Sequence, residues 1–321
     1  MVLSARILAV LISVLMGIGI LVPDAAATTV AETGSGKYVV RAAPAGELAR
    51  AAPELPDLSP FNGEAVQAKL KRTPKGRAVY RRMVEVVELG EFTGSDGRLA
   101  IWAQRQTRNP MVICIEDGYV KPDDLARQLS AEHFEQTSEG VFLLRLPMVV
   151  RQGATLHIDG KARDFRMSEE RGAFLVNDGA LYITDSALTG WREAENGPAE
   201  FRDGKRFRPF LLSWGGTETY IVNSRVANLG YAASKSYGVS FSQYTPGMVK
   251  RMNRTHPTGW LLDSEFVDLW YGFYCYEADD VVIARNVYRD NIVYGIDPHD
   301  RSNRLIIAEN EAHGTRQKHG L

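Results

Sequence analysis

From Val141 to the last residue, short apolar runs alternate with polar turns along the chain. Runs of this length that are bounded by turn residues are typical of buried strands rather than of helices. The sequence therefore predicts a β-rich region at residues 141–321. Its strands are expected at VFLLRLPMVV (141–150), ATLHIDG (154–160), GAFLVNDG (172–179), ALYITDS (180–186), ETYIVNS (218–224), WLLDSEF (260–266), VVIARN (281–286) and RLIIAEN (304–310).

Several of these runs end in the same way, with apolar residues followed closely by Asp or Asn. The polar residues of this first ladder are Asp185, Asn223, Asp263, Asn286 and Asn310. Stacked Asp or Asn side chains can satisfy backbone groups at a corner that recurs in each repeat. The pattern therefore indicates an internal repeat.

A second ladder advances together with the first and pairs an aromatic residue with Gly and an apolar residue. Its members are Tyr237-Gly238-Val239, Tyr271-Gly272-Phe273, Tyr294-Gly295-Ile296 and His319-Gly320-Leu321, and the last two glycine spacings are 23 and 25 residues. A period in this range indicates a solenoid. The alternative is a β-sandwich, but sandwich strands would not keep two residue-specific ladders in register. We therefore predict a mainly β chain in which residues 141–321 form a right-handed parallel β-helix.

Residues 62–140 have a mixed pattern, in which apolar residues recur four apart at Val66 and Leu70 and again from Val79 to Val87. This spacing predicts helices, and the apolar run at 111–120 predicts a strand. The elements expected are two short helices on either side of Thr73-Pro74, a strand at 111–120 and a helix at 122–129. We predict a small N-terminal α/β cap at 62–140.

The first 27 residues have the pattern of a secretory signal. Arg6 precedes an apolar run from Ile7 to Val22, and Ala25-Ala26-Ala27 follows. We predict cleavage after Ala27. A retained membrane anchor is the alternative, but the run is shorter than the roughly 20 residues that span a bilayer. Residues 28–61 are rich in Ala, Pro and Gly and are interpreted as a linker.

The chain contains two cysteines, Cys114 and Cys275, and each lies in a strand-like run. Export to an oxidising compartment makes a disulfide between them possible. Two buried free thiols are the simpler interpretation, because two cysteines fix no pairing by themselves.

The charge balance of the chain argues against a nucleic-acid partner. The chain has 38 basic and 39 acidic residues, and its formal net charge is −1. Nothing in this balance is typical of a nucleic-acid-binding protein, so we predict no nucleic-acid partner. A polyanionic ligand would need a local basic strip.

The motif Asp297-Pro298-His299-Asp300 follows directly on a member of the second ladder, Tyr294-Gly295-Ile296. A single His is most often structural or exposed, so the motif alone indicates little. The position of the motif strengthens the case for a functional role, because a turn fixed by Pro298 would hold an imidazole and two carboxylates beside a solenoid face. Such faces bind extended ligands.

The sequence around this motif resembles the alginate mannuronan C5-epimerases of the periplasmic, biosynthetic type. The resemblance runs from about residue 37 to the end. It is carried by FLVNDGALYITDS (174–186), GYAASKSYGVSFSQY (230–244), TPGMVKRMNRTHPTGWLLDSEFVDLWYGFYCYEADDVVIARN (245–286), YGIDPHDRSNRLIIAEN (294–310) and GTRQKHG (314–320). It implies conversion of D-mannuronate to L-guluronate within alginate during biosynthesis and export. The implied partners are polymannuronate and alginate secretion complex proteins, and the implied location is the periplasm.

C5 epimerisation needs a base, an acid on the opposite sugar face, and groups that stabilise the charge on the uronate carboxylate. An imidazole suits the base role near pH 7, so we expect His299 to be the base. Asp297 or Asp300 is expected to orient it. The acid is expected to be Tyr294 or a bound water, with rung packing as the other interpretation of Tyr294.

Five cationic or imidazole side chains follow the motif and are candidates for contact with uronate carboxylates, with a solvated surface role as the alternative. They are Arg301, Arg304, Arg316, Lys318 and His319. In the family that the chain resembles, the arginine that neutralises the carboxylate lies just past the KHG motif. The chain ends at Leu321, so we expect a C-terminally truncated chain whose activity is reduced by roughly 10²–10³.

Two further functions are alternatives. A polyuronate lyase would remove the same C5 proton, and a non-catalytic polysaccharide-binding or secretion-scaffold protein would only hold the polymer. The chain has no glycine- and aspartate-rich calcium-loop repeat. We therefore predict no metal and no cofactor.

Overall fold

The computed structural model describes residues 55–72, 74–92, 101–102, 104–106 and 109–320, and the backbone alone of 29–33 and 36–40. The chain divides into two compact units, Met1–Pro56 and Asp57–Leu321. In the first unit, β1 (Thr29–Thr33) pairs antiparallel with β2 (Gly36–Val40). This hairpin falls within the segment 28–61 that is predicted as a linker. The predicted signal peptide, 1–27, lies outside the described residues.

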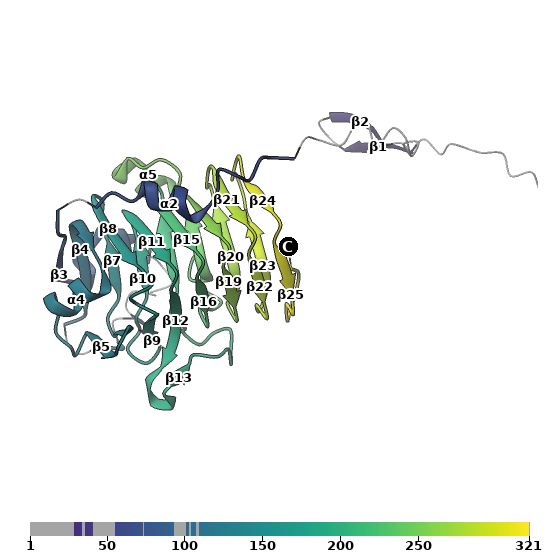
Figure 1. Ribbon diagram of the computed structural model, residues 1–321. Coiled ribbons are helices and arrows are strands. Elements are labelled where there is room, and N and C mark those ends of the chain that lie inside the picture. The colour runs from purple at the N-terminus through teal and green to yellow at the C-terminus, as the bar shows by residue number, and fades with distance from the viewer. Residues whose placement is uncertain are drawn as a thin grey trace, which may run out of the picture. The chain divides into compact units, whose positions relative to one another are not determined.

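The second unit is a right-handed parallel β-helix, whose rungs follow one another from teal to yellow in Figure 1. Each rung contributes one strand to each of three parallel sheets, which we call sheets I, II and III. Sheet I contains β7 (Met148–Val150), β10 (Leu175–Asn177), β14 (Leu211–Trp214), β17 (Gly238–Ser242), β20 (Tyr271–Tyr276) and β23 (Tyr294–Pro298). Sheet II contains β8 (Ala154–Ile158), β11 (Ala180–Thr184), β15 (Glu218–Val222), β18 (Thr258–Leu262), β21 (Val281–Ala284) and β24 (Ile306–Ala308). Sheet III contains β6 (Val141–Leu144), β9 (Asp164–Ser168), β12 (Ala187–Arg192), β16 (Arg225–Ala227), β19 (Glu265–Val267), β22 (Val287–Arg289) and β25 (Glu311–His313).

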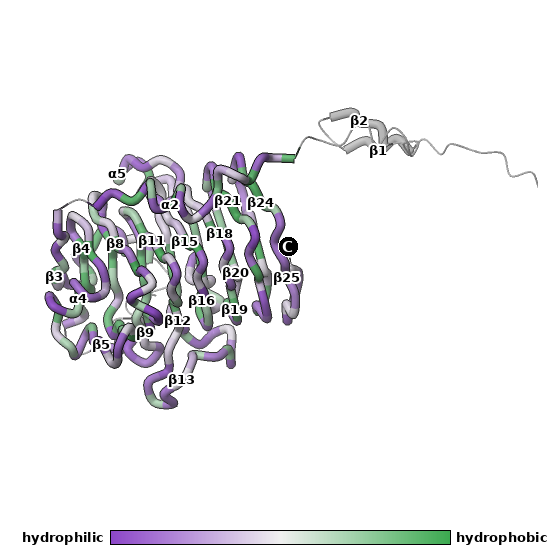
Figure 2. The backbone as a smooth tube through the Cα atoms, viewed as in Figure 1, coloured by the Kyte–Doolittle hydropathy of each residue, from purple (hydrophilic) through white to green (hydrophobic). Residues whose placement is uncertain are grey.

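The repeat predicted from the first ladder is confirmed by the register of sheet II. Ile183, Ile221, Leu261 and Ile283 lie opposite one another on successive strands, and all four are fully buried. Hydrophobic residues gather in the strands and hydrophilic residues in the turns, as Figure 2 shows. Stacked apolar residues therefore fill the interior of the helix, and the turns face solvent.

The polar part of the first ladder consists of two adjacent columns rather than one. From β11 on, the corner that follows sheet II has a left-handed residue in each rung, and these residues are Asp185, Asn223, Asp263, Arg285 and Glu309. The next column is Ser186, Ser224, Ser264, Asn286 and Asn310. In it, the Ser264 N–H donates to Asn286 Oδ1 at 3.0 Å, and the Asn286 N–H donates to Asn310 Oδ1 at 3.0 Å. The prediction that aligns Asn286 with Asp263 is therefore wrong by one residue.

The N-terminal elements differ from the prediction in one helix. The helix α2 (Gly63–Lys69) and the helix α4 (Pro122–Gln128) are confirmed, as is the strand β4 (Met111–Val120). The second helix predicted after Thr73-Pro74 is wrong. Its residues form the strand β3 (Arg77–Arg82) and the 3₁₀ turns Met83–Glu85 and Val87–Phe92. The cause is tertiary, because β3 pairs antiparallel with β4, and this pairing overrides a spacing that also suits a helix.

The β-helix also begins earlier than residue 141. Ile113–Ile115 of β4 pair with β7 in sheet I, and Gly118–Val120 pair with β8 in sheet II. One long strand in the predicted cap segment 62–140 therefore starts two sheets. A short strand, β5 (Phe134–Ser138), pairs antiparallel with β6 at the edge of sheet III.

Cys114 and Cys275 are free and fully buried, so the interpretation as thiols is confirmed and the alternative of a disulfide is wrong. Burial raises the pKa of the Cys114 thiol to about 12. Within the described residues, no helix is both long and apolar enough to cross a membrane.

The outward side of sheet I is covered over its first rungs. Met83, Leu89, Phe92 and Trp102 pack against outward residues of β4, β7, β10 and β14 in one buried cluster. A short helix, α5 (Pro246–Met252), adds to this cover through partly buried apolar side chains. On β20 and β23, outward side chains such as Tyr274 and Asp297 are only partly buried. The candidate site lies on these last rungs.

Candidate functional site

Tyr274 and Asp297 lie directly opposite one another on β20 and β23 of sheet I. The same pairing places Tyr271 opposite Tyr294, which confirms this part of the second ladder. Side chains that are paired across parallel strands point to the same side of the sheet. Phe273 and Ile296 point inward and are buried, so Tyr274 and Asp297 point outward.

His299 follows the end of β23 and keeps the register of the strand. Its backbone N–H donates to the Cys275 carbonyl at 2.9 Å. Since side chains alternate along an extended strand, His299 points to the same side as Asp297 two residues before it. Its side chain is 51% exposed, and its Nδ1 lies 3.9 Å from Asp297 Oδ1. This distance is longer than a hydrogen bond but places the carboxylate next to the imidazole.

The structure distinguishes between the two carboxylates of the motif. Asp297 faces His299, whereas Asp300 is exposed and accepts the Glu277 N–H through its backbone carbonyl at 3.0 Å. Burial raises the pKa of the Asp297 carboxyl above its ordinary value, and the neighbouring His299 and Lys318 act in the opposite direction. The environment of Asp297 therefore favours a cation beside it.

Four tyrosines form a tyrosine cluster next to this pair, and they are Tyr237, Tyr271, Tyr274 and Tyr294. The rings of Tyr237 and Tyr271 are stacked at 4.6 Å, and the Tyr294 ring lies 5.1 Å from that of Tyr271. The Tyr274 ring lies 4.9 Å from Tyr237 and 5.6 Å from His299. Burial raises the pKa of Tyr271 to about 12 and raises that of Tyr274 as well. Both phenols are therefore protonated at neutral pH and are weaker acids than an exposed tyrosine.

Two of the predicted binding residues extend this arrangement by one rung. His319 pairs with Tyr294 through an isolated β-bridge, and its ring lies 6.3 Å from the Tyr294 ring. Lys318 Nζ lies 5.5 Å from the centre of the Tyr294 ring. We use the name strip for the tyrosine cluster together with Asp297, His299, Lys318 and His319. The strip runs across the strands, so it follows the helix axis.

The three predicted arginines are not part of the strip, because each has a carboxylate partner elsewhere. Arg301 donates to Glu277 at 2.7 Å, and Arg304 donates to Asp280 at 2.7 Å. Both partners belong to the preceding rung. Arg316 lies 3.1 Å from the buried carboxylate of Asp268. These contacts link rungs or turns to one another.

Sequence reasoning missed Tyr274, although the second ladder contains the signal that would have found it. Aligning Tyr271-Gly272 with Tyr294-Gly295 also aligns Tyr274 with Asp297, and Tyr276 with His299. The structure has this register for Tyr274 and Asp297. The ladder is interrupted one rung earlier, where the register shifts between Gly238 and Ser240.

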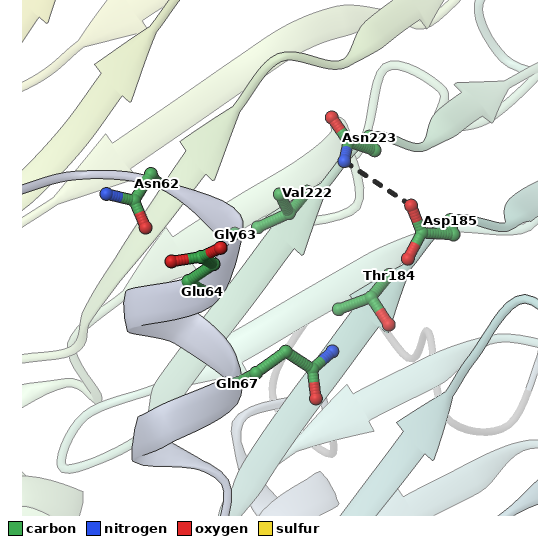
Figure 3. Close-up of a pocket in the computed structure, with 8 residues that line it drawn as sticks. All are labelled: Asn62, Gly63, Glu64, Gln67, Thr184, Asp185, Val222 and Asn223. Carbon is green, nitrogen blue, oxygen red and sulfur yellow. Dashed lines mark hydrogen bonds between the residues drawn. The ribbon is translucent and has the colours of Figure 1, made fainter.

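A hollow that lies away from the strip is drawn in Figure 3, between α2 and the corner after sheet II. It has a volume of about 650 Å³, and Asn223 donates to Asp185 on its wall at 3.3 Å. Its other lining residues include Glu64 and Gln67 of α2. It contains no imidazole or cation, so it lacks the groups that proton abstraction from an anionic sugar needs. Across the described ranges, no three His, Cys, Asp or Glu side chains form a group suited to a metal ion.

Comparison with known proteins gives a consistent result, although no family model matches the chain. The chain is 57% identical to a mannuronan C5-epimerase of Pseudomonas putida over 284 residues, which are 88% of this chain and 55% of that protein. It is 54% identical to the mannuronan C5-epimerase AlgG of Azotobacter vinelandii over 300 residues, which are 93% of this chain and 57% of the relative. The chain thus spans about half the length of the curated relatives that it matches.

The chain is also similar to a solved structure. The crystal structure of a periplasmic alginate epimerase, AlgG, superposes with a TM-score of 0.82 at 48% sequence identity. The match covers 84% of this chain and 64% of that one.

Proposed function

The chain belongs to the mannuronan C5-epimerase family, and on this premise we propose that it converts D-mannuronate to L-guluronate within alginate. The observation that carries the proposal is the pair of His299 and Asp297 on the uncovered part of sheet I. The imidazole is half exposed and has a partly buried carboxylate 3.9 Å from one of its nitrogens. A base with this arrangement can reach a polymer that lies across the strands.

His299 is the base that removes the C5 proton. This proton is acidic because it lies α to the uronate carboxylate, and a neutral imidazole accepts protons effectively near pH 7. Asp297 orients the ring through Nδ1 and leaves Nε2 for the substrate. Catalytic hydrogen bonds are often long in the absence of substrate and shorten in the complex, which agrees with the observed 3.9 Å.

Tyr294 returns a proton to the opposite face of the sugar, either directly or through a bound water. It is the first residue of β23 and is paired with Tyr271, whose ring lies 6.0 Å from that of the outward-pointing Tyr274. Its ring also contacts Tyr271 and His319, so it has a packing role in addition. Tyr274 supports His299 through ring contact and does not exchange protons with the substrate.

Lys318 and His319 contact the uronate carboxylate. Both lie beside Tyr294, and Lys318 is close enough to act on the carboxyl of Asp297. Arg301, Arg304 and Arg316 hold neighbouring parts of the helix, because their charges are matched by carboxylates of the protein. A cation that is already paired stabilises a developing enolate less than an unpaired one does.

The chain acts in the periplasm on the exported polymer, with residues 1–27 as the signal for export and alginate secretion proteins as partners. The matching crystal structure is that of a periplasmic alginate epimerase. The pattern of residues 1–27 is that of a cleavable signal.

Proton NMR of polymannuronate tests the proposal. We expect guluronate signals to grow when the polymer is incubated with the full chain. Ultraviolet absorbance of the same reaction separates the alternatives, since a lyase would expel the C4 oxygen and leave an unsaturated sugar that absorbs. A folded chain that binds polymer but gives neither signal would be a binding protein, and the proposal would be wrong.

A further inference from the structure

A second hollow, of about 250 Å³, lies where sheet I turns into sheet II over the first rungs. It is lined by the turns between β7 and β8, between β10 and β11, and between β14 and β15. Three basic side chains, Lys69, Lys71 and Arg254, line it as well. None of these residues belongs to the strip.

Arg254 gives this hollow a buried donor that has no acceptor. Its side chain is 7% exposed and forms an ion pair with Asp178, whose side chain is 1% exposed. Asp178 also accepts from the Tyr244 hydroxyl at 3.0 Å. No described residue accepts a hydrogen bond from Arg254 Nε. A buried donor without an acceptor is costly, and a ligand oxygen in the hollow would relieve that cost.

Lys69 and Lys71 make the hollow positively charged overall. Lys71 is exposed and has no ion-pair partner among the residues that the structure describes. The Lys69 ammonium lies 4.6 Å from the centre of a Trp260 ring, and the Tyr182 hydroxyl donates to the Lys69 carbonyl at 3.2 Å. The segment after α2 is therefore fixed in place. Arg254 matches the charge of Asp178, so two lysines remain against the single carboxylate of Glu218.

The size of the hollow limits what it can hold. Pockets for drug-sized ligands measure roughly 300–1,000 Å³, so 250 Å³ suits one small unit rather than an oligomer. Gln152 and Thr155 on its wall supply amide and hydroxyl groups of the kind that bind sugar hydroxyls. The unit is therefore small, polar and anionic.

We propose that this hollow is a second saccharide site, which binds one uronate unit of the polymer through Lys71 and Arg254. The inference rests on the proposed function for the identity of the polymer. β10 and β23 are four strand steps apart in sheet I, which corresponds to about 19 Å along the helix axis. The outward side of sheet I is covered between them, so the hollow does not continue the strip. A polymer held at both sites is bound more tightly than at either one alone, because the second contact is intramolecular.

Isothermal titration with trimannuronate tests this inference, because a trimer is too short to occupy both sites at once. In the His299→Ala background, which prevents turnover, we expect two trimers per chain. Lys71→Glu should weaken one of the two binding events at least about tenfold and leave the other unchanged. Lys161→Glu is the matched control, since it makes the same charge change at an exposed turn outside the hollow. Neutral mannotriose should not occupy the hollow.

A single trimer per chain, or binding that Lys71→Glu does not alter, would show that the hollow is not a saccharide site. This result is separate from a failure of the proposed function. If only the proposed function failed, both trimers would bind, but polymannuronate would yield no guluronate with the unsubstituted chain.

Discussion

The ring of Tyr274 lies 5.6 Å from the ring of His299, and Tyr274 is paired in register with Asp297, two residues before that histidine. One rung thus contacts the imidazole that the next rung presents. The tyrosine is half-buried between the Tyr237 ring and the imidazole. The orientation of His299 therefore depends on contacts from two rungs.

Substituting the base should remove turnover without unfolding the chain. We expect His299→Ala to lower the rate of guluronate formation by about 10²–10⁴-fold, because general-base catalysis contributes an effect of this size. Proton NMR of polymannuronate measures the rate. His313→Ala is the control, since His313 is also exposed but lies on β25 in sheet III. Equal rates for the two variants would contradict the assignment of His299.

Two substitutions of Tyr274 separate its ring from its hydroxyl. Tyr274→Phe keeps the ring against His299 and should retain most of the turnover. Tyr274→Ala removes this support and should lower kcat by about tenfold with little change in KM, since a misplaced catalytic group loses rate rather than affinity. If Tyr274→Phe lost as much activity as Tyr274→Ala, the phenol rather than the ring would be the important group.

Loss of the charge should affect the kinetics at Lys318 and not at Arg304. Lys318→Gln should lower kcat/KM by about tenfold or more, because it removes the cation that we propose binds the substrate carboxylate. Arg304→Gln should leave the kinetics unchanged and change the free energy of unfolding little, as for exposed ion pairs. Steady-state kinetics and urea unfolding of both variants measure the two effects. Lost activity in Arg304→Gln would place that residue at the substrate.

Asp268 is expected to be more sensitive to substitution than the partly exposed carboxylates of the turns. Its Oδ2 lies 2.7 Å from Arg208, and both side chains are almost fully buried. Asp268→Asn leaves the buried guanidinium without a charge partner and should cost about 3–5 kcal/mol of unfolding free energy. Asp263→Asn is the control, because its ion pair with Arg285 is partly exposed and should cost about 1 kcal/mol or less. Similar urea midpoints for the two variants would contradict this difference.

His157 should make the stability of the helix depend on pH. Burial lowers the pKa of His157 to about 4 from an ordinary value of 6.5, and the ring is held by the Tyr119 and Thr184 hydroxyls at 2.7 and 2.9 Å. The unfolded chain binds a proton at this residue below pH 6.5, whereas the folded chain does so only near pH 4. The free energy of unfolding should therefore fall as the pH drops from 6.5 to 4.

Urea unfolding across this pH range provides the measurement. His157→Gln should show a smaller fall than the unsubstituted chain, and His313→Gln should not. A fall of the same size in all three chains would assign the pH dependence to other groups.

The repeats at the last rungs could be predicted from the sequence because these rungs place equivalent residues at a nearly constant spacing. The spacing of 23 residues between Gly272 and Gly295 is the spacing of the rungs, and it determines which residues share a column. The motif at Asp297 and His299 could be located for the same reason.

Other features depend on contacts that no local pattern contains. The residues from Val79 to Val87 fit a helix in sequence, and only the pairing of Val79 with Cys114 makes part of them a strand. Arg301 and Arg304 are predicted from the sequence as binding residues, and the sequence does not show that each has a carboxylate partner in the rung before it. Glu277 and Asp280 each lie 24 residues earlier, and this spacing brings them against the two arginines.

The corner columns determine where the chain can accept additional sequence. Asp263 and Arg285 are 22 residues apart, whereas Asp185 and Asn223 are 38 apart although they occupy adjacent positions in the same column. The extra residues leave the helix after β12, in the 3₁₀ turn Glu193–Glu195 and the strand β13 (Gly197–Pro198), and return at β14. New loops grafted at this turn could therefore add contacts for a polymer, while the rungs that present Asp297 and His299 keep their register.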